Sequence, residues 1–124
     1  MKVLVADDSS TMRRIIKNTL GKIGVSDVTE ATNGAEAVAG AMDASVKLIL
    51  MDCNMPEMSG IDAVRAIRTS GNKTPIVMVT TEAEKKRVVE AVQAGINDYM
   101  VKPFTPDDLA TRVKKFGIDQ AVPA

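Results

Sequence analysis

Residues 46–52 read Val-Lys-Leu-Ile-Leu-Met-Asp, the most hydrophobic stretch of the chain, and this stretch runs directly into an acid. Its apolar residues do not alternate with polar ones in the way that a strand with one solvated face requires. A continuous apolar run of this length is typical of a parallel β-strand that is covered on both faces. We therefore expect a buried parallel strand with Asp52 at its carboxyl end.

Outward from this strand, short apolar runs alternate with segments of helical spacing. The apolar runs predict further strands over residues 3–6, 28–31, 75–79 and 99–101. The spacing predicts helices in the segments 9–23, 33–42, 59–67, 88–95 and 105–116. Five strand–helix units indicate an α/β fold with a single, doubly wound parallel sheet of five strands. The strand order is not evident from these patterns.

Several helices also carry recognisable ends. Ser9 or Ser10 can cap the first helix, the segment from Asn33 has the spacing of a capping box, and Thr105 can cap the last helix. The fourth helix is expected to end at Gly95. The first helix is expected to bury one apolar stripe, formed by Met12, Ile15, Ile16, Thr19, Leu20 and Ile23. The fourth helix is marked by Val88, Val89, Val92 and Ile96.

Composition narrows the class of protein. The 124 residues suffice for one domain. Because 16 Lys and Arg balance 16 Asp and Glu, the net charge is zero, which argues against binding to nucleic acids or membranes through overall charge. The chain has no histidine, which excludes Ser-His-Asp triads, and Cys53 is its one cysteine, which excludes an intrachain disulfide. The apolar run at the N-terminus is too short for a signal peptide. We expect a soluble, cytoplasmic monomer.

Polar residues stand where the expected strands end. Asp7 and Asp8 follow the first strand, Asp52 ends the third, Thr80 ends the fourth and Lys102 ends the fifth. Each of them alone also has an ordinary explanation as a helix cap or a solvated edge residue. Because a doubly wound sheet places its site at the carboxyl ends of its strands, their conjunction predicts a functional site there.

The charges at this edge indicate which chemistry the site supports. Asp7, Asp8 and Asp52 contribute −3, and Lys102 reduces the sum to −2. Three carboxylates in close quarters need a cation, and an all-oxygen set prefers Mg²⁺. With the cation bound, the site can admit an anionic phosphoryl donor. Asp52 is then placed to attack phosphorus, while Lys102 and Thr80 stabilise the transferred oxygens.

Two other classes of protein place an acid or a phosphate at such a sheet edge. An aspartate-based phosphohydrolase of the haloacid dehalogenase type needs a second acid two residues after its nucleophile, where this chain has Asn54. A flavin-binding module needs a phosphate loop after the first strand, where Asp7 and Asp8 would repel phosphate. Both hypotheses fit the sequence poorly.

The motifs, taken together, resemble the receiver domain of two-component response regulators over about residues 2–116. They are Asp7-Asp8, Met51 to Gly60 around Asp52, Thr80, and Tyr99-Met100-Val101-Lys102-Pro103-Phe104. The resemblance implies a flavodoxin-like (βα)5 fold of strand order 2-1-3-4-5. It places the receiver domain in residues 1–117 and leaves residues 118–124 as a flexible tail.

Carried over by position, the resemblance assigns roles to these residues. Asp52 is the phosphoacceptor, which forms an aspartyl phosphate, and Lys102 contacts the phosphoryl group. Asp8, the Asp52 side chain and the Asn54 backbone carbonyl ligate Mg²⁺, with Asp7 acting mainly through water. The Lys102–Pro103 peptide bond is expected to be cis.

Within this family the chain is most similar to single-domain regulators of chemotaxis. Asn54 and Glu82 occupy the variable positions two residues after Asp52 and Thr80, a pairing typical of short-lived chemotaxis signals. The implied phosphodonor is a histidine kinase, the implied output partner is the flagellar motor switch, and a phosphatase is a further partner. A phosphorelay intermediate, a phosphate sink or a regulator outside motility remain as alternatives within the family. The resemblance implies a signalling protein that catalyses only its own phosphorylation and dephosphorylation.

The switch is expected to couple Thr80 to Tyr99. Phosphate on Asp52 draws the Thr80 hydroxyl inward and leaves space that Tyr99 can fill, and Thr81 narrows the path. The output surface is expected on the fourth helix, fifth strand and fifth helix. Its candidate residues are Thr81, Glu82, Lys85, Lys86, Val89, Tyr99 and Val101.

Overall fold

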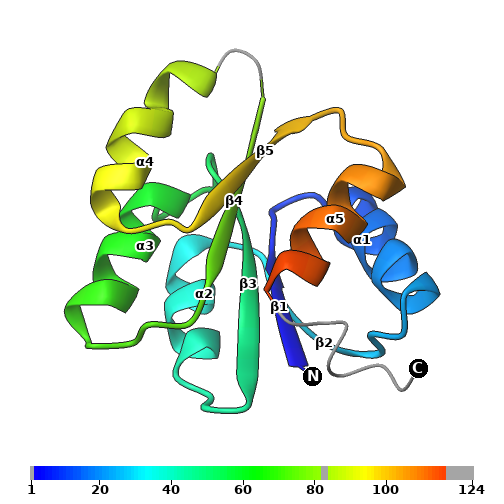
Figure 1. Cartoon of the computed structure of the whole chain (residues 1–124). Coiled ribbons are helices and arrows are strands. Elements are labelled where there is room, and N and C mark those ends of the chain that lie inside the picture. The colour runs from blue at the N-terminus through cyan, green and yellow to red at the C-terminus, as the bar shows by residue number, and fades with distance from the viewer. Residues whose placement is uncertain (1, 82–83, 117–124) are drawn as a thin grey trace.

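The computed structural model describes residues 2–81 and 84–116, so Glu82 and the expected tail over residues 118–124 lie outside the described residues. In chain order the elements are β1 (Lys2–Ala6), α1 (Ser10–Lys22), β2 (Asp27–Ala31), α2 (Gly34–Ala41), β3 (Val46–Asp52), α3 (Gly60–Thr69), β4 (Ile76–Thr81), a 3₁₀ turn η1 (Lys85–Arg87), α4 (Val88–Ala94), β5 (Asp98–Lys102) and α5 (Pro106–Lys115). Figure 1 shows these elements on the ribbon.

The sheet has five parallel strands in the order β2-β1-β3-β4-β5, as expected. The strand that begins at Val46 lies in the middle of this sheet, between β1 and β4. All strands point the same way, so their carboxyl ends share the upper edge of the sheet in Figure 1. The doubly wound, flavodoxin-like architecture is thereby confirmed.

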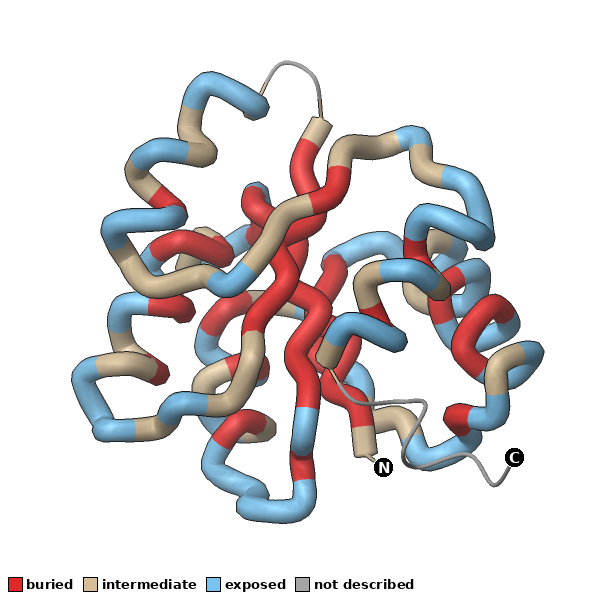
Figure 2. Tube along the Cα trace, viewed as in Figure 1, coloured by how far each residue is buried: buried red, intermediate tan, exposed pale blue. Residues whose placement is uncertain are grey.

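Helices cover both faces of the sheet. Figure 1 shows α1 and α5 on one face and α2, α3 and α4 on the other, and Figure 2 shows the strands as the buried centre of the molecule. The side chains of β3 alternate between two cores: Ile49 and Met51 join the cluster under α2, α3 and α4, while Leu48 and Leu50 join the cluster under α1 and α5. Burial on both faces explains why this strand has no polar alternation.

Four helices begin at a side-chain cap. Ser9, Asn33, Ser59 and Thr105 each accept a hydrogen bond from the backbone N–H three residues ahead. Among these four caps, only Thr105 completes a capping box. The capping box expected from the spacing of Asn33 and Glu36 does not form at α2, because the Glu36 carboxylate accepts hydrogen bonds from Thr32 instead.

One predicted apolar stripe is partly wrong. Ile15 is 46% exposed, since it falls on the outer side of α1, away from the buried Ile16. In α4, Val89 and Val92 are 67% and 57% exposed, and the buried residue of this helix is Ala91. The helix ends at Gly95 as predicted, in the left-handed conformation (φ 118°) that favours glycine.

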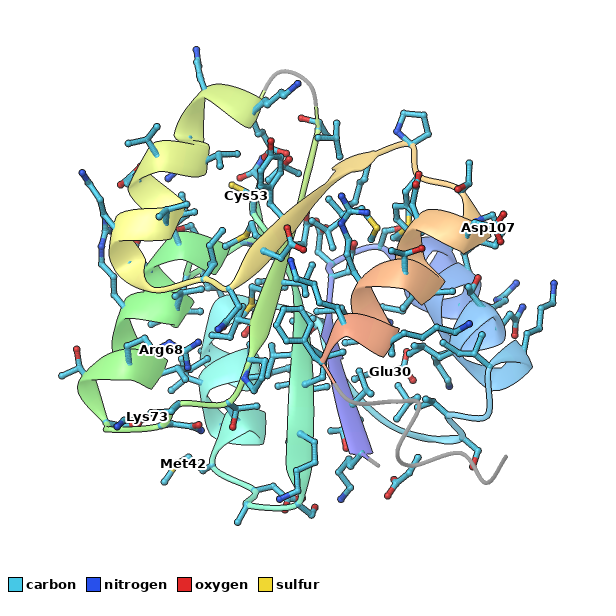
Figure 3. All side chains as sticks on the ribbon, viewed as in Figure 1. Glu30, Met42, Cys53, Arg68, Lys73 and Asp107 are labelled. Carbon is cyan, nitrogen blue, oxygen red and sulfur yellow. The ribbon has the colours of Figure 1, made fainter. Side chains whose placement is uncertain are left out.

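Arg68 ties together the loops that lead into β4 and β5. Its guanidinium is half-buried and donates to the backbone oxygens of Asn72 (2.9 Å), Thr74 (2.8 Å) and Gly95 (3.0 Å), and to Oδ1 of Asn97 (3.0 Å). Figure 3 shows this residue on α3. The contacts fix the starts of the two strands whose far ends carry Thr80 and Lys102.

Replacing Arg68 with Ala is expected to lower the free energy of unfolding by about 2–3 kcal/mol, because the change leaves several backbone carbonyl oxygens without a hydrogen-bond donor. Urea unfolding followed by circular dichroism measures this loss. Arg65→Ala is the matched control: Arg65 forms exposed ion pairs with Asp62 and Glu90, so its loss should cost less than about 1 kcal/mol. Equal effects of the two substitutions would contradict the role of Arg68.

Candidate phosphoacceptor and metal site

The strand ends bring the predicted site residues together. Asp7 follows β1, Asp52 ends β3, Thr80 lies near the end of β4 and Lys102 ends β5. A hollow of about 400 Å³ opens at this edge of the sheet. Its lining consists of Asp8, Asp52, Asn54, Thr81, Glu84 and Lys102.

Three carboxylates form the acidic part of the site. Asp7, Asp8 and Asp52 each offer one oxygen, and these oxygens all lie within 4.8 Å of one another. Asp7 and Asp52 are only 1% and 5% exposed, whereas Asp8 faces solvent. Buried carboxylates at this spacing repel one another, and their all-oxygen donor set fits a hard divalent cation such as Mg²⁺.

Lys102 bridges two of these acids. Its Nζ donates to Oδ2 of Asp7 at 3.0 Å and to Oδ1 of Asp52 at 3.3 Å. Burial lowers the pKa of Lys102, but the hydrogen bond to Asp7 and the charges of both acids outweigh burial and raise it overall. The ammonium therefore stays charged beside Asp52. The peptide bond that follows, Lys102–Pro103, is cis.

The environment of Asp52 makes its ionisation unfavourable. Burial, followed by the negative charge of Asp7, raises the pKa of Asp52 to about 6, although Lys102 acts in the opposite direction. One lysine thus compensates the site only in part. A bound cation would complete the compensation and favour the ionised carboxylate.

Side chains of Asp7 and Arg13 hold the loop after β1. Oδ1 of Asp7 accepts from the Ser9 N–H at 2.9 Å, and Arg13 donates to the Asp7 carbonyl at 2.8 Å while it pairs with Glu30. Arg13 lies outside the apolar stripe predicted for the first helix. The structure shows that Arg13 holds the backbone at Asp7, a contact that no spacing in the sequence indicates.

Thr80 is buried without a hydrogen-bond partner. It is 1% exposed, and its Oγ1 is the one buried side-chain nitrogen or oxygen lacking a partner within residues 2–81 and 84–116. An unpaired buried hydroxyl is costly. A phosphoryl oxygen on Asp52 would supply the missing partner.

Glu84 is a site residue that the sequence reasoning missed. It lines the hollow with Asp52, and its carboxylate is bonded by Thr81. The formal charge counted from the sequence therefore omits one carboxylate of the site. The signal that could have found it is the capping-box spacing Thr81-x-x-Glu84 at the end of β4.

Cys53, next to Asp52, is fully buried. Burial, with a contribution from the charge of Glu84, raises the pKa of its thiol, so it stays protonated and packs as a small apolar side chain. Figure 3 shows Cys53 on the side of the sheet that α4 covers.

The expected output residues are only partly brought together. Lys85, Tyr99 and Val101 line a second hollow of about 330 Å³ beside α5, and Tyr99 is half-buried there. Lys86 is exposed and does not line this hollow. Glu82 lies in the part of the chain that the structure does not describe.

Residues 3–114 match the model of the response regulator receiver domain. The chain belongs to the response regulator receiver family. This membership confirms the resemblance drawn from the motifs and removes the phosphohydrolase and flavin-binding hypotheses. Across the described part of the receiver domain, no helix is both long and apolar enough to cross a membrane.

Known relatives of the receiver domain include chemotaxis proteins. Chemotaxis protein CheY1 of Helicobacter pylori is 50% identical over 117 residues, which cover 92% of this chain and 94% of that protein. Chemotaxis protein CheY of Pseudomonas aeruginosa is 44% identical, with 93% and 94% covered. The receiver domain is thus a CheY-like regulator of a two-component system.

Solved structures agree with the fold. CheY4 of Vibrio cholerae superposes with a TM-score of 0.82 at 37% identity, covering 93% of this chain and 97% of that one. The receiver domain of the sensor histidine kinase PA1611 of Pseudomonas aeruginosa gives 0.85 at 32% identity, covering 95% and 97%. The latter structure has a magnesium ion coordinated in its active-site cleft.

The raised pKa of Asp52 predicts a pH-dependent cost in the metal-free protein. Above about pH 6 the ionised carboxylate destabilises the folded state, and below about pH 4 the protonated group no longer does. Asp52→Asn should therefore raise the free energy of unfolding by about 2 kcal/mol at pH 7.5 in chelator, and by much less at pH 4. Urea titrations at both pH values measure the difference.

Asp107→Asn serves as the control, since Asp107 is an exposed acid in the first turn of α5. Removal of this charge should change stability by about 1 kcal/mol or less at pH 7.5, in the destabilising direction. If Asp52→Asn raised the free energy of unfolding equally at both pH values, the stabilisation could not come from removal of the Asp52 charge.

Proposed function

We propose that this receiver domain is a chemotaxis switch that accepts a phosphoryl group from a histidine kinase on Asp52 and then binds the flagellar motor switch. The observation that carries the proposal is the convergence of the acids, Lys102 and the unpartnered Thr80 hydroxyl at one sheet edge. The 50% identity to chemotaxis protein CheY1 supports the choice of pathway.

Mg²⁺ is the proposed cofactor. The side chains of Asp8 and Asp52 and the backbone carbonyl of Asn54 would hold it, with Asp7 acting through water. When bound, the cation neutralises the carboxylates and stabilises charge on the transferred phosphoryl oxygens. The exposed position of Asp8 leaves one side of the site open to solvent for this ion.

The chain's own residues then perform the transfer. An ionised Asp52 oxygen attacks phosphorus, and the bond from phosphorus to the donor's nitrogen or acyl oxygen breaks, with its electron pair leaving on the donor. Lys102 already donates a hydrogen bond to Asp52, and its ammonium stabilises the negative charge that develops on the phosphoryl oxygens. Because these 124 residues contain no histidine, a phosphohistidine donor lies outside them.

The signal leaves through β4 and β5. Thr80 on β4 pairs with Val101 on β5 in the sheet register, and Val101 lies two residues after Tyr99. When Thr80 moves to bond the phosphoryl group, Tyr99 can follow into the space that it vacates. We propose Lys85, Lys86, Tyr99 and Val101, with Glu82, as the surface that the motor switch contacts.

The remaining predictions concern the protein as a whole. We propose a cytoplasmic monomer whose receiver domain spans residues 1–117, with residues 118–124 as its tail. A phosphatase is proposed as a second partner that shortens the signal. The protein is a signalling switch, and its chemistry is confined to its own Asp52.

Replacing Asp8 with Ala is expected to weaken Mg²⁺ binding at least about tenfold, because the change removes one of the carboxylates that hold the cation. Isothermal titration calorimetry of the folded variant measures the affinity. Asp107→Ala removes an acid remote from the hollow and should leave the affinity unchanged. An Asp8→Ala affinity equal to that of the original chain would contradict the proposed ligation.

The proposed output is tested by affinity capture from lysate of the source cells, in Mg²⁺ with or without beryllofluoride as a phosphoryl mimic. Mass spectrometry should identify a flagellar motor switch component only with the mimic, and Asp52→Asn should abolish its capture. Thr80→Ala should still bind beryllofluoride yet lose the partner. Capture of a phosphotransfer protein instead would favour a phosphorelay intermediate and contradict the motor output.

A further inference from the structure

Glu84 and Thr81 form a reciprocal hydrogen-bonded pair at the end of β4. Oε1 of Glu84 accepts from the Thr81 backbone N–H at 3.0 Å and from the Thr81 hydroxyl at 2.9 Å. In return, the Glu84 N–H donates to the Thr81 carbonyl at 3.1 Å. The carboxylate therefore engages both donors that Thr81 can offer.

The pair belongs to the hollow over the phosphoacceptor. Thr81 and Glu84 line it together with Asp52 and Lys102. Burial is the main cause of the raised pKa of Asp52 and of Cys53, and the negative charge of Glu84 adds to it at both. The negative charge of Glu84 thus disfavours the ionised form of Asp52, in addition to the effect of burial.

Glu84 forms no ion pair within the described part of the chain. The ion pairs among residues 2–81 and 84–116 do not include Glu84, whereas the lysine of the site is shared by Asp7 and Asp52. Glu84 is also absent from the group of acids that can hold a metal ion. It adds negative charge to the hollow without belonging to this group of possible ligands.

We propose that Glu84 is a positioning residue that restrains phosphoryl acceptance: its carboxylate occupies the Thr81 donors in the resting state and slows the entry of anionic phosphodonors. This inference rests on the proposed function of Asp52. An incoming phosphoryl group meets a like charge, and the Thr81 N–H and hydroxyl are engaged by Glu84 when it arrives. Once Asp52 carries phosphate, the site gains about one further negative charge, which opposes the Glu84–Thr81 pair.

Glu84→Gln removes the charge and keeps an oxygen that can accept from Thr81. It should raise the rate of phosphorylation by acetyl phosphate about three- to tenfold at low ionic strength, and salt should shrink this gain. It should also weaken Mg²⁺ binding, measured by calorimetry, about twofold, because a nearby negative charge is lost. Faster anion entry together with weaker cation binding is a signature that mere loosening of the structure would not produce.

Glu84→Ala removes the acceptor as well as the charge, and it should raise the rate at least as much as Glu84→Gln. The matched control is Glu36→Gln. The Glu36 carboxylate also accepts from a threonine backbone N–H and hydroxyl, those of Thr32, but it does not line the hollow. Glu36→Gln should therefore change neither the rate nor the Mg²⁺ affinity.

The outcomes separate this inference from the proposed function. If the original chain is phosphorylated on Asp52 but Glu84→Gln and Glu84→Ala react no faster, the role of Glu84 is overturned and the proposed function stands. A gain that high salt does not reduce, or tighter Mg²⁺ binding by Glu84→Gln, also overturns it. If the original chain accepts no phosphoryl group at all, both the proposed function and the inference fail.

Discussion

The bridge from Lys102 to Asp7 and Asp52 is the interaction on which the site depends. It joins residues that lie 95 and 50 positions apart in the chain, and it exists because parallel strands end at the same edge of the sheet. One ammonium cannot balance the acids gathered there, and burial together with the charge of Asp7 raises the pKa of Asp52 despite Lys102. The site is therefore built with an excess of negative charge that a cation relieves, and that same excess makes an added phosphoryl group a strong perturbation.

The elements around this site differ in how firmly they are packed. Arg68 and Arg13 tie backbone segments on either side of the sheet, so the starts of β4 and β5 and the loop after β1 are fixed. By contrast, α4 buries Ala91 and exposes Val89 and Val92. Few buried contacts oppose a shift of this helix, and it follows directly on Glu84 and η1. A change in charge at Asp52 thus acts next to the element that is least anchored in the core.

Patterns within single elements could be predicted from the sequence. The apolar run before Asp52 indicated the central strand, and the cap at Thr105 indicated the start of α5, because both depend on local spacing. Ile15 was misassigned because it adjoins Ile16 on a helix, where one position separates the buried side from the exposed side. The strand order followed only from the family resemblance. The contacts of Arg13 arise from tertiary packing, which no local pattern encodes. The Glu84–Thr81 contact has a local capping-box spacing, but its place beside Asp52 in the hollow depends on the pairing of β3 with β4.

The most direct test of the account is intact-mass spectrometry of the protein after incubation with acetyl phosphate, with Mg²⁺ or with chelator. The account predicts the mass gain of one phosphoryl group in Mg²⁺, its absence in chelator, and its absence in Asp52→Asn. Borohydride reduction before proteolysis should locate the modified residue at Asp52. Labelling that persists in Asp52→Asn, or that proceeds equally well in chelator, would contradict the assignment of this sheet edge as a cation-dependent phosphoacceptor site.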